Sequence, residues 1–162
     1  MEKNEWIQYG YEILTDFFSK LSDNKIDPVD LLKRPQNYIT YFSNWLKQQN
    51  LSAANKDDKS WLGQRIGFFI AEVLVARYQS YWDTCRDNNS PLFGHFVLTG
   101  FTINPITKIS HAGDHTIIEE VGSGETRINK IIDPILSGIN FLNQSALDLE
   151  DYINKIEAEL VL

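Results

Sequence analysis

Residues 60–79 read SWLGQRIGFFIAEVLVARYQ, and their apolar side chains recur at the spacing of a helix. Gly63, Gly67 and Ala71 recur every four residues within this segment. Because a glycine inside a helix costs about 1 kcal/mol relative to alanine, two of them need a compensating contact. We therefore expect a central helix over residues 60–79, begun by an N-cap at Ser60 and packed closely against another backbone along its small residues.

The same helix carries a second stripe that contains charged and polar side chains. Arg65, Phe68, Glu72 and Gln79 fall close together on it, and we expect them to form the side that faces solvent. If this side were buried instead, Glu72 would be an acid with a perturbed pKa and a candidate functional group.

Helices are also predicted on both sides of this segment. Apolar stripes indicate them over residues 3–22, from Asp27 to Pro35, and from Gln36 to about Gln49, followed by a polar loop over residues 50–59. Both Asp27-Pro28 and Asp133-Pro134 have the residues of a helix start. The second of these predicts a helix to about Leu142, and a cap at Ser145 predicts a last helix to about Leu160.

The middle of the chain has the pattern of strands. Residues 81–86 and 93–103 are rich in β-formers around a turn at residues 87–91, which predicts an antiparallel hairpin. Residues 105–132 fit either short helices that start at Pro105 or a second hairpin around Gly122-Ser123-Gly124, and we favour the hairpin. The fold class is therefore one α+β domain over residues 1–162: a helical N-terminal half, a small antiparallel sheet and C-terminal helices.

Composition excludes several classes of function. The chain has 22 acidic and 15 basic side chains, a formal net charge of −7, and such a surface repels nucleic-acid phosphates and anionic lipid. A single cysteine, Cys85, excludes an internal disulfide and any site that needs several cysteines. The residues after Met1 lack a signal-peptide pattern, and no apolar run is long enough to cross a membrane. We expect a cytoplasmic protein without cofactors that binds neither nucleic acid nor membrane.

Three histidines are the candidates for chemistry. His111, Asp114 and His115 lie within five residues and have side chains that bind divalent metals, although Gly113 between them favours an ordinary polar turn. Together with His95, these residues support an alternative hypothesis, that the chain is a small metal-binding protein or an enzyme. Cys85 opposite His95 can in principle form a thiolate pair, but a buried cysteine acting as a small apolar residue is commoner. The Gly122–Glu125 loop lacks the residues of a phosphate-binding loop.

The run Trp61-Leu62-Gly63-Gln64-Arg65-Ile66-Gly67-Phe68-Phe69, with Arg77-Tyr78 and Trp82 after it, resembles small bacterial domains in which such a helix leads into a short sheet. In size, acidity and α+β layout the chain is similar to some immunity proteins, which neutralise toxins of neighbouring bacteria. The resemblance covers residues 61–101 and contains no catalytic motif. It implies a protein without enzymatic activity that binds another protein.

We therefore expect a protein-binding domain, of the kind that inhibits a basic toxin domain. The acidic residues of the later half are the expected contacts, because a negative surface speeds encounter with a cationic partner. They are Glu119, Glu120, Glu125, Asp148, Glu150 and Asp151. A second alternative is a structural module that self-associates through exposed aromatic side chains. The sequence does not define the oligomeric state.

Overall fold

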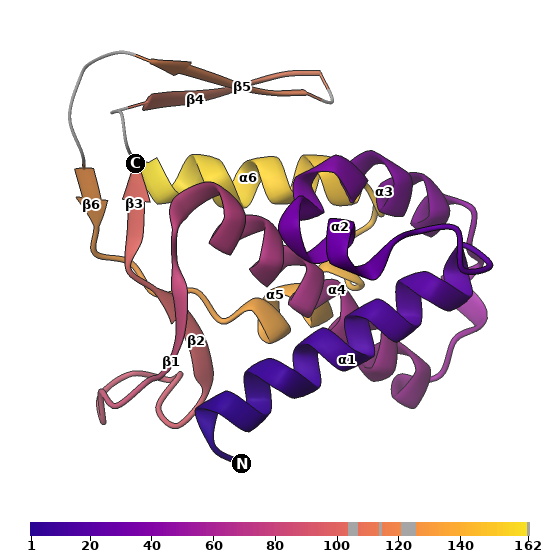
Figure 1. Cartoon of the computed structure of the whole chain (residues 1–162), viewed down its shortest axis with the longest axis horizontal. Coiled ribbons are helices and arrows are strands. Elements are labelled where there is room, and N and C mark those ends of the chain that lie inside the picture. Colours follow the sequence, from indigo (N-terminus) through magenta and orange to yellow (C-terminus); the bar gives the residue numbers. More distant parts are fainter. Residues whose placement is uncertain (104–106, 114, 121–125, 162) are drawn as a thin grey trace.

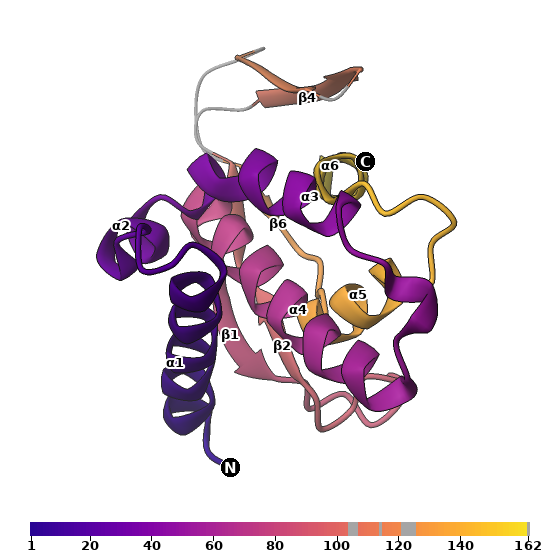
Figure 2. The same cartoon turned by 90° about the vertical axis from the view of Figure 1, so that its right-hand side faces the viewer.

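Helix α4 (Lys56–Tyr78) runs through the middle of the fold in the computed structural model (Figures 1 and 2). The structure describes residues 1–103, 107–113, 115–120 and 126–161. Every residue of α4 from Ile66 to Leu74 is buried, which confirms the predicted central helix. Its start differs from the prediction, because the side chain of Asn55 and not Ser60 caps it, accepting a hydrogen bond of 2.8 Å from the Asp58 N–H.

The N-terminal half is helical, as predicted. Its helices are α1 (Lys3–Leu21), α2 (Pro28–Lys33) and α3 (Ile39–Lys47), with short 3₁₀ turns at Pro35–Tyr38 and Leu51–Ala53. Asp27 caps α2 as expected, since its carboxylate accepts a hydrogen bond of 3.0 Å from the Val29 N–H. Phe18 of α1 stacks on Phe69 of α4 at 5.5 Å, and Phe42 of α3 meets the same ring edge to face at 5.2 Å. These aromatic contacts fix α1 and α3 on α4.

Helix α5 (Pro134–Phe141) crosses α4 with almost no side chain between the two backbones. A Cβ placed on Gly138 would lie 2.1 Å from the carbonyl oxygen of Gly63, and one on Gly67 would lie 2.6 Å from that of Pro134. Both distances are far below any real carbon contact, so only glycine fits at these positions. This confirms the predicted close approach along the small residues of α4. It also gives Gly138 a packing role that its sequence context did not indicate.

The strands form three two-stranded antiparallel sheets among the described residues. In the first, β1 (Tyr81–Thr84) pairs with β2 (Phe96–Thr99), which confirms the predicted hairpin. The expected second strand is broken at Gly100, whose φ is +73°, so β3 (Phe101–Ile103) leaves β2 and pairs with β6 (Thr126–Ile128). The third sheet joins β4 (Thr107–Ala112) to β5 (His115–Glu120).

This pairing corrects the predicted second hairpin. The expected partners were residues 117–121 and 126–132, but residues 115–120 pair with 107–112 and residues 126–128 pair with β3. The chain therefore reverses beside Gly113, where φ is +62°, which agrees with the turn that Gly113 was expected to favour between the two histidines. The predicted tip at Gly122-Ser123-Gly124 lies outside the described residues.

Helix α6 (Leu149–Val161) lies beside the β4–β5 hairpin, as Figures 1 and 2 show. Asp148 and not Ser145 caps it, accepting a hydrogen bond of 3.0 Å from the Asp151 N–H. Its fully buried Glu157 joins α6 to the end of α4, through an ion pair with Arg77 and a hydrogen bond of 2.8 Å from the Tyr78 hydroxyl. In the described part of the chain, no helix has both the length and the apolar character needed to cross a membrane.

The stripe of α4 that was expected to face solvent is largely covered. Phe68 is 2% and Glu72 is 7% exposed, because the N-terminal half of α1 packs over them. Burial raises the pKa of Glu72 to about 7. Burial also raises the pKa of the Tyr11 phenol on α1, and the nearby charge of Glu72 raises it further. Glu72 is thus the perturbed acid of the alternative prediction.

Candidate functional site

An apolar groove lies where α1, the β1–β2 connection and α5 meet, at the end of the molecule that holds Met1 (Figure 1). Its volume is about 290 Å³. The residues that line it are Trp6, Gly94, His95, Phe96, Asp133, Ile135, Leu136 and Ile139. On its rim Leu136 is 42% and Ile139 is 37% exposed, and Phe93 next to the lining is 54% exposed. Apolar side chains that are exposed together around a hollow are typical of a binding surface.

The floor of the groove is rigid because it is the edge of an aromatic cluster. The indole of Trp6 stacks on Phe96 with the ring centroids 4.8 Å apart, and it also contacts Phe68 and Trp82. Phe68 in turn fills the space beside Gly10, where a Cβ would lie 2.4 Å from its ring. The rings that line the groove are therefore held in place by the core and are already ordered.

The one polar edge of the groove is a histidine–aspartate pair. Nδ1 of His95 lies 2.7 Å from Oδ2 of Asp133. The other oxygen of Asp133, Oδ1, accepts a hydrogen bond of 3.0 Å from the Leu136 N–H and so caps α5. A carboxylate only accepts hydrogen bonds, so Nδ1 of His95 carries the hydrogen and the ring has a fixed orientation.

Backbone hydrogen bonds hold His95 in place from the other side. Its N–H donates to the Leu92 carbonyl at 2.9 Å, and its own carbonyl accepts from the Cys85 N–H at 2.9 Å. Cys85 and His95 are thus neighbours across the hairpin, as the sequence suggested. The Cys85 side chain is buried, however, and the imidazole is paired with Asp133 instead. The structure therefore supports the interpretation of Cys85 as a small apolar residue.

The size and chemistry of the groove limit what it can hold. Cavities for cofactors and drug-sized ligands run from about 300 to 1,000 Å³, so this groove is at or below the smallest of them. Its lining contains no lysine or arginine, and Asp133 is its one acidic side chain. The space suits one or two apolar side chains of another protein better than a cofactor.

No protein-family model, curated protein or solved structure matches this chain. Function therefore has to be inferred from the chemistry of the site.

The acidic side chains that we expected to contact a partner fall into two groups. Asp148, Glu150 and Asp151 lie at the start of α6, where Asp148 also contacts Lys47 at 3.5 Å and Asp151 contacts Lys155 at 3.0 Å. Glu119 is exposed on β5 and faces Lys108 of β4 in the register. Glu120 ends β5, and Glu125 lies outside the described residues. The group at the start of α6 is thus partly neutralised by the chain's own lysines.

The predicted metal ligands are likewise spread over separate elements. His111 is the last but one residue of β4 and pairs with Thr116, while His115 begins β5 and pairs with Ala112. Asp114 lies outside the described residues. His95 belongs to the groove and its partner is Asp133. Across the described ranges, no three His, Cys, Asp or Glu side chains form a cluster able to hold a metal ion. Metal binding by residues 111–115 stays a prediction, which titration with Zn²⁺ tests.

The sequence indicated His95 as a candidate residue, but it did not indicate the groove around it. Trp6, His95 and Asp133 come from segments far apart in the chain, and no local spacing indicates that they meet. The available signal was indirect: Asp133 was predicted as a helix cap, and a cap uses only one of the two carboxylate oxygens. The second oxygen is free to bind a distant residue, here one 38 positions away.

Proposed function

We propose that this chain is a cytoplasmic protein-binding domain without catalytic activity, which binds a basic partner protein through the apolar groove. The observation that carries the proposal is the exposed apolar rim of Leu136 and Ile139 around a preformed aromatic floor. An inhibitor of a basic toxin domain, as the resemblance in residues 61–101 implies, is the kind of protein that fits this description.

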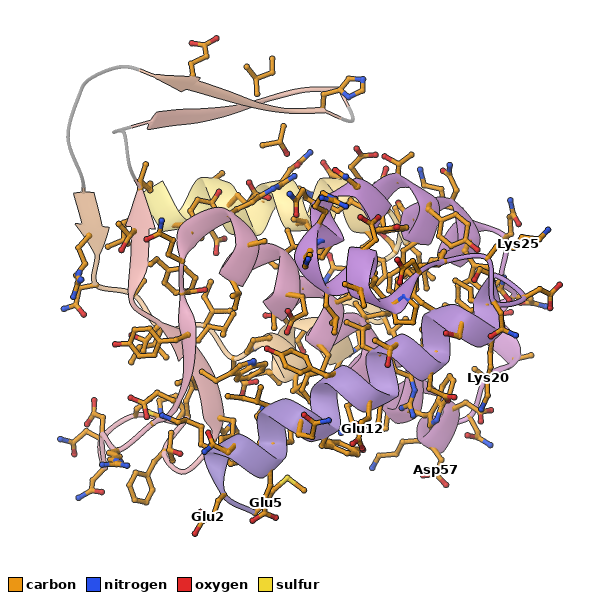
Figure 3. The ribbon with its side chains drawn as sticks, in the orientation of Figure 1. Glu2, Glu5, Glu12, Lys20, Lys25 and Asp57 are labelled. Atoms are coloured by element: carbon orange, nitrogen blue, oxygen red, sulfur yellow. The ribbon has the colours of Figure 1, made fainter. Side chains whose placement is uncertain are left out.

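Charge supports a basic partner. The chain has a formal net charge of −7, and the groove is lined by the acid Asp133 but by no lysine or arginine. Glu2 directly precedes α1 and Glu5 lies in its first turn, next to Trp6. Both are exposed, at the end of α1 where Figure 3 labels them. Negative charge around an apolar contact raises the rate of encounter with a cationic protein more than it raises affinity.

A substitution on the groove rim tests the proposal. The purified chain is immobilised and exposed to lysate of the source cell, and bound proteins are compared with those of the Leu136→Lys variant. Lysine removes an apolar contact and repels a basic partner, so we expect the partner to be lost. Since Leu136 is 42% exposed, the substitution leaves the core intact.

Val29→Lys is the matched control, because Val29 is 58% exposed on α2 and lies outside the groove. It makes the same chemical change, and we expect it to retain the partner. Recovery of the same proteins by both variants, or of none by the unmodified chain, would show the proposal to be wrong. Light scattering at high concentration identifies the case in which the partner is a second copy of the chain.

The His95–Asp133 pair supports a second candidate function, general acid–base catalysis. A carboxylate that orients an imidazole is the arrangement by which a histidine takes a proton from water or a hydroxyl group. The test is hydrolysis of p-nitrophenyl butyrate, whose acyl chain suits an apolar groove, by the chain and by His95→Gln. A rate that exceeds that of free imidazole and depends on His95 supports this candidate, and equal rates for both proteins exclude it.

A further inference from the structure

Within the groove, the His95–Asp133 pair is a defined hydrogen-bonding site in an otherwise apolar surface. In the neutral form of the ring, Nδ1 donates to Asp133, so Nε2 presents a lone pair and acts as an acceptor. No donor in the described ranges of the chain occupies Nε2. The His95 side chain is 50% exposed, whereas that of Asp133 is 8% exposed. A partner therefore reaches the pair through the imidazole.

The acceptor is also held in place before a partner arrives. Asp133 is fixed by its bond to the Leu136 N–H, and the His95 backbone is fixed by Leu92 and Cys85. An acceptor that is already oriented loses little conformational entropy on binding. Its contribution to affinity is correspondingly larger than that of a flexible surface side chain.

The charge of the pair selects the donor. A neutral imidazole bonded to a carboxylate has a net charge of −1, and no lysine or arginine lines the groove to neutralise it. A neutral hydroxyl or amide gains only a hydrogen bond at Nε2, whereas a cationic donor also gains attraction to Asp133 behind the ring. The apolar rim formed by Leu136 and Ile139 lies along the same groove.

We propose that the groove binds a segment in which a lysine or arginine stands next to an apolar anchor, with the cation donating to Nε2 of His95. This inference rests on the proposed function and names the chemistry of the partner. The anchor fills the space over Trp6 and Phe96 between the rim residues, and the cation takes the one polar edge.

A displayed library of random dodecapeptides, selected on the immobilised full chain, tests this inference. We expect the selected peptides to carry lysine or arginine beside apolar residues. One selected peptide is then synthesised, and its Kd is measured for the chain and for the variants Leu136→Lys, His95→Phe and His95→Gln. Phenylalanine keeps the ring but removes the acceptor, so we expect binding to weaken at least about tenfold. Glutamine offers an amide oxygen in its place, so we expect affinity within about threefold of the original.

The outcomes separate the inference from the proposed function. Peptides that need Leu136 but lack a cation, or that bind His95→Phe as well as the original chain, overturn the inference and leave the groove as a binding surface. Peptides whose Kd is the same for the original chain and for Leu136→Lys bind elsewhere, and they also overturn the inference. Whether the cellular partner needs Leu136 is decided separately by the lysate experiment. Thermal unfolding of each variant shows whether a loss of binding reflects loss of the fold.

Discussion

Helix α4 meets α5 through bare backbone, whereas at its contacts with α1 and α6 a carboxylate is buried among the side chains. At the first contact Gly138 lies against Gly63 and Gly67, and the added carbon of an alanine has no space. At the second, a carboxylate is buried and its cost depends on its partners. A close contact between two backbones therefore accepts only one residue type, glycine. A buried carboxylate is accepted with or without a partner, but the two cases differ in the stability of the fold.

The two buried acids sharpen this comparison. Glu157 is fully buried but is satisfied by Arg77 and by the Tyr78 hydroxyl. Glu72 is 7% exposed, and no side chain among the described residues pairs with it as Arg77 pairs with Glu157. Burial accordingly raises the pKa of Glu72 to about 7. One acid joins two helices, and the other lowers the stability of the folded chain when it is ionised.

The largest effect is expected at the backbone contact. Gly138→Ala adds a carbon 2.1 Å from the Gly63 carbonyl oxygen and 2.5 Å from the Gly67 nitrogen, so α5 has to move away from α4. Alanine normally stabilises a helix by about 1 kcal/mol relative to glycine. Here we expect the free energy of unfolding to fall by at least about 4 kcal/mol, which is a large share of the roughly 5–15 kcal/mol that keeps a typical domain folded. Urea denaturation monitored by circular dichroism measures it.

Gly113→Ala is the control for this prediction. Gly113 has a φ of +62° but open space around the position of a Cβ, so alanine there costs only backbone strain of about 1 kcal/mol. If both variants lost the same stability, the close approach of α4 and α5 would not be what requires Gly138.

The satisfied acid gives the next largest effect. Glu157→Ala leaves the Arg77 guanidinium and the buried Tyr78 hydroxyl without their partner. Breaking a buried ion pair costs about 3 to 5 kcal/mol, and the partial exposure of Arg77 places the expected loss near about 3 kcal/mol. Tyr78→Phe removes only one hydrogen bond and should cost about 1 kcal/mol. Equal losses in the two variants would contradict the role of the ion pair.

Much of the helical scaffold follows from sequence because its signals are local. Asp27 and Asp133 were predicted as caps and cap their helices, and the glycines of α4 predicted a backbone neighbour. The predicted caps Ser60 and Ser145 were wrong, because the side chains of Asn55 and Asp148 accept the hydrogen bonds from the first N–H groups of α4 and α6. A cap is chosen among nearby polar residues by geometry that residue type alone does not define.

What the sequence missed depends on residues that meet from distant segments. The strand over residues 93–103 was expected to be continuous, but Gly100 has a positive φ and sends β3 to pair with β6. Glu72 was placed on the solvent side because α1 was not known to cover it. The groove needed both α1 and α5 in position, so His95 was found from its residue type while Asp133 and Trp6 were not.

The effect of the unpartnered acid on stability depends on pH, and its sign differs from that of the others. The pKa of Glu72 is about 7 in the folded chain and 4.5 when the side chain is exposed. The folded state therefore binds the proton more tightly, and stability is full below about pH 4.5 and falls as the pH rises through about 7. Glu72→Gln removes this loss, so at pH 8 we expect it to raise the free energy of unfolding by at most about 3 kcal/mol. At pH 4.5 the two proteins should have similar stabilities. Urea denaturation at both pH values measures the difference, and a variant that is less stable at pH 8 would mean that the carboxylate is paired after all.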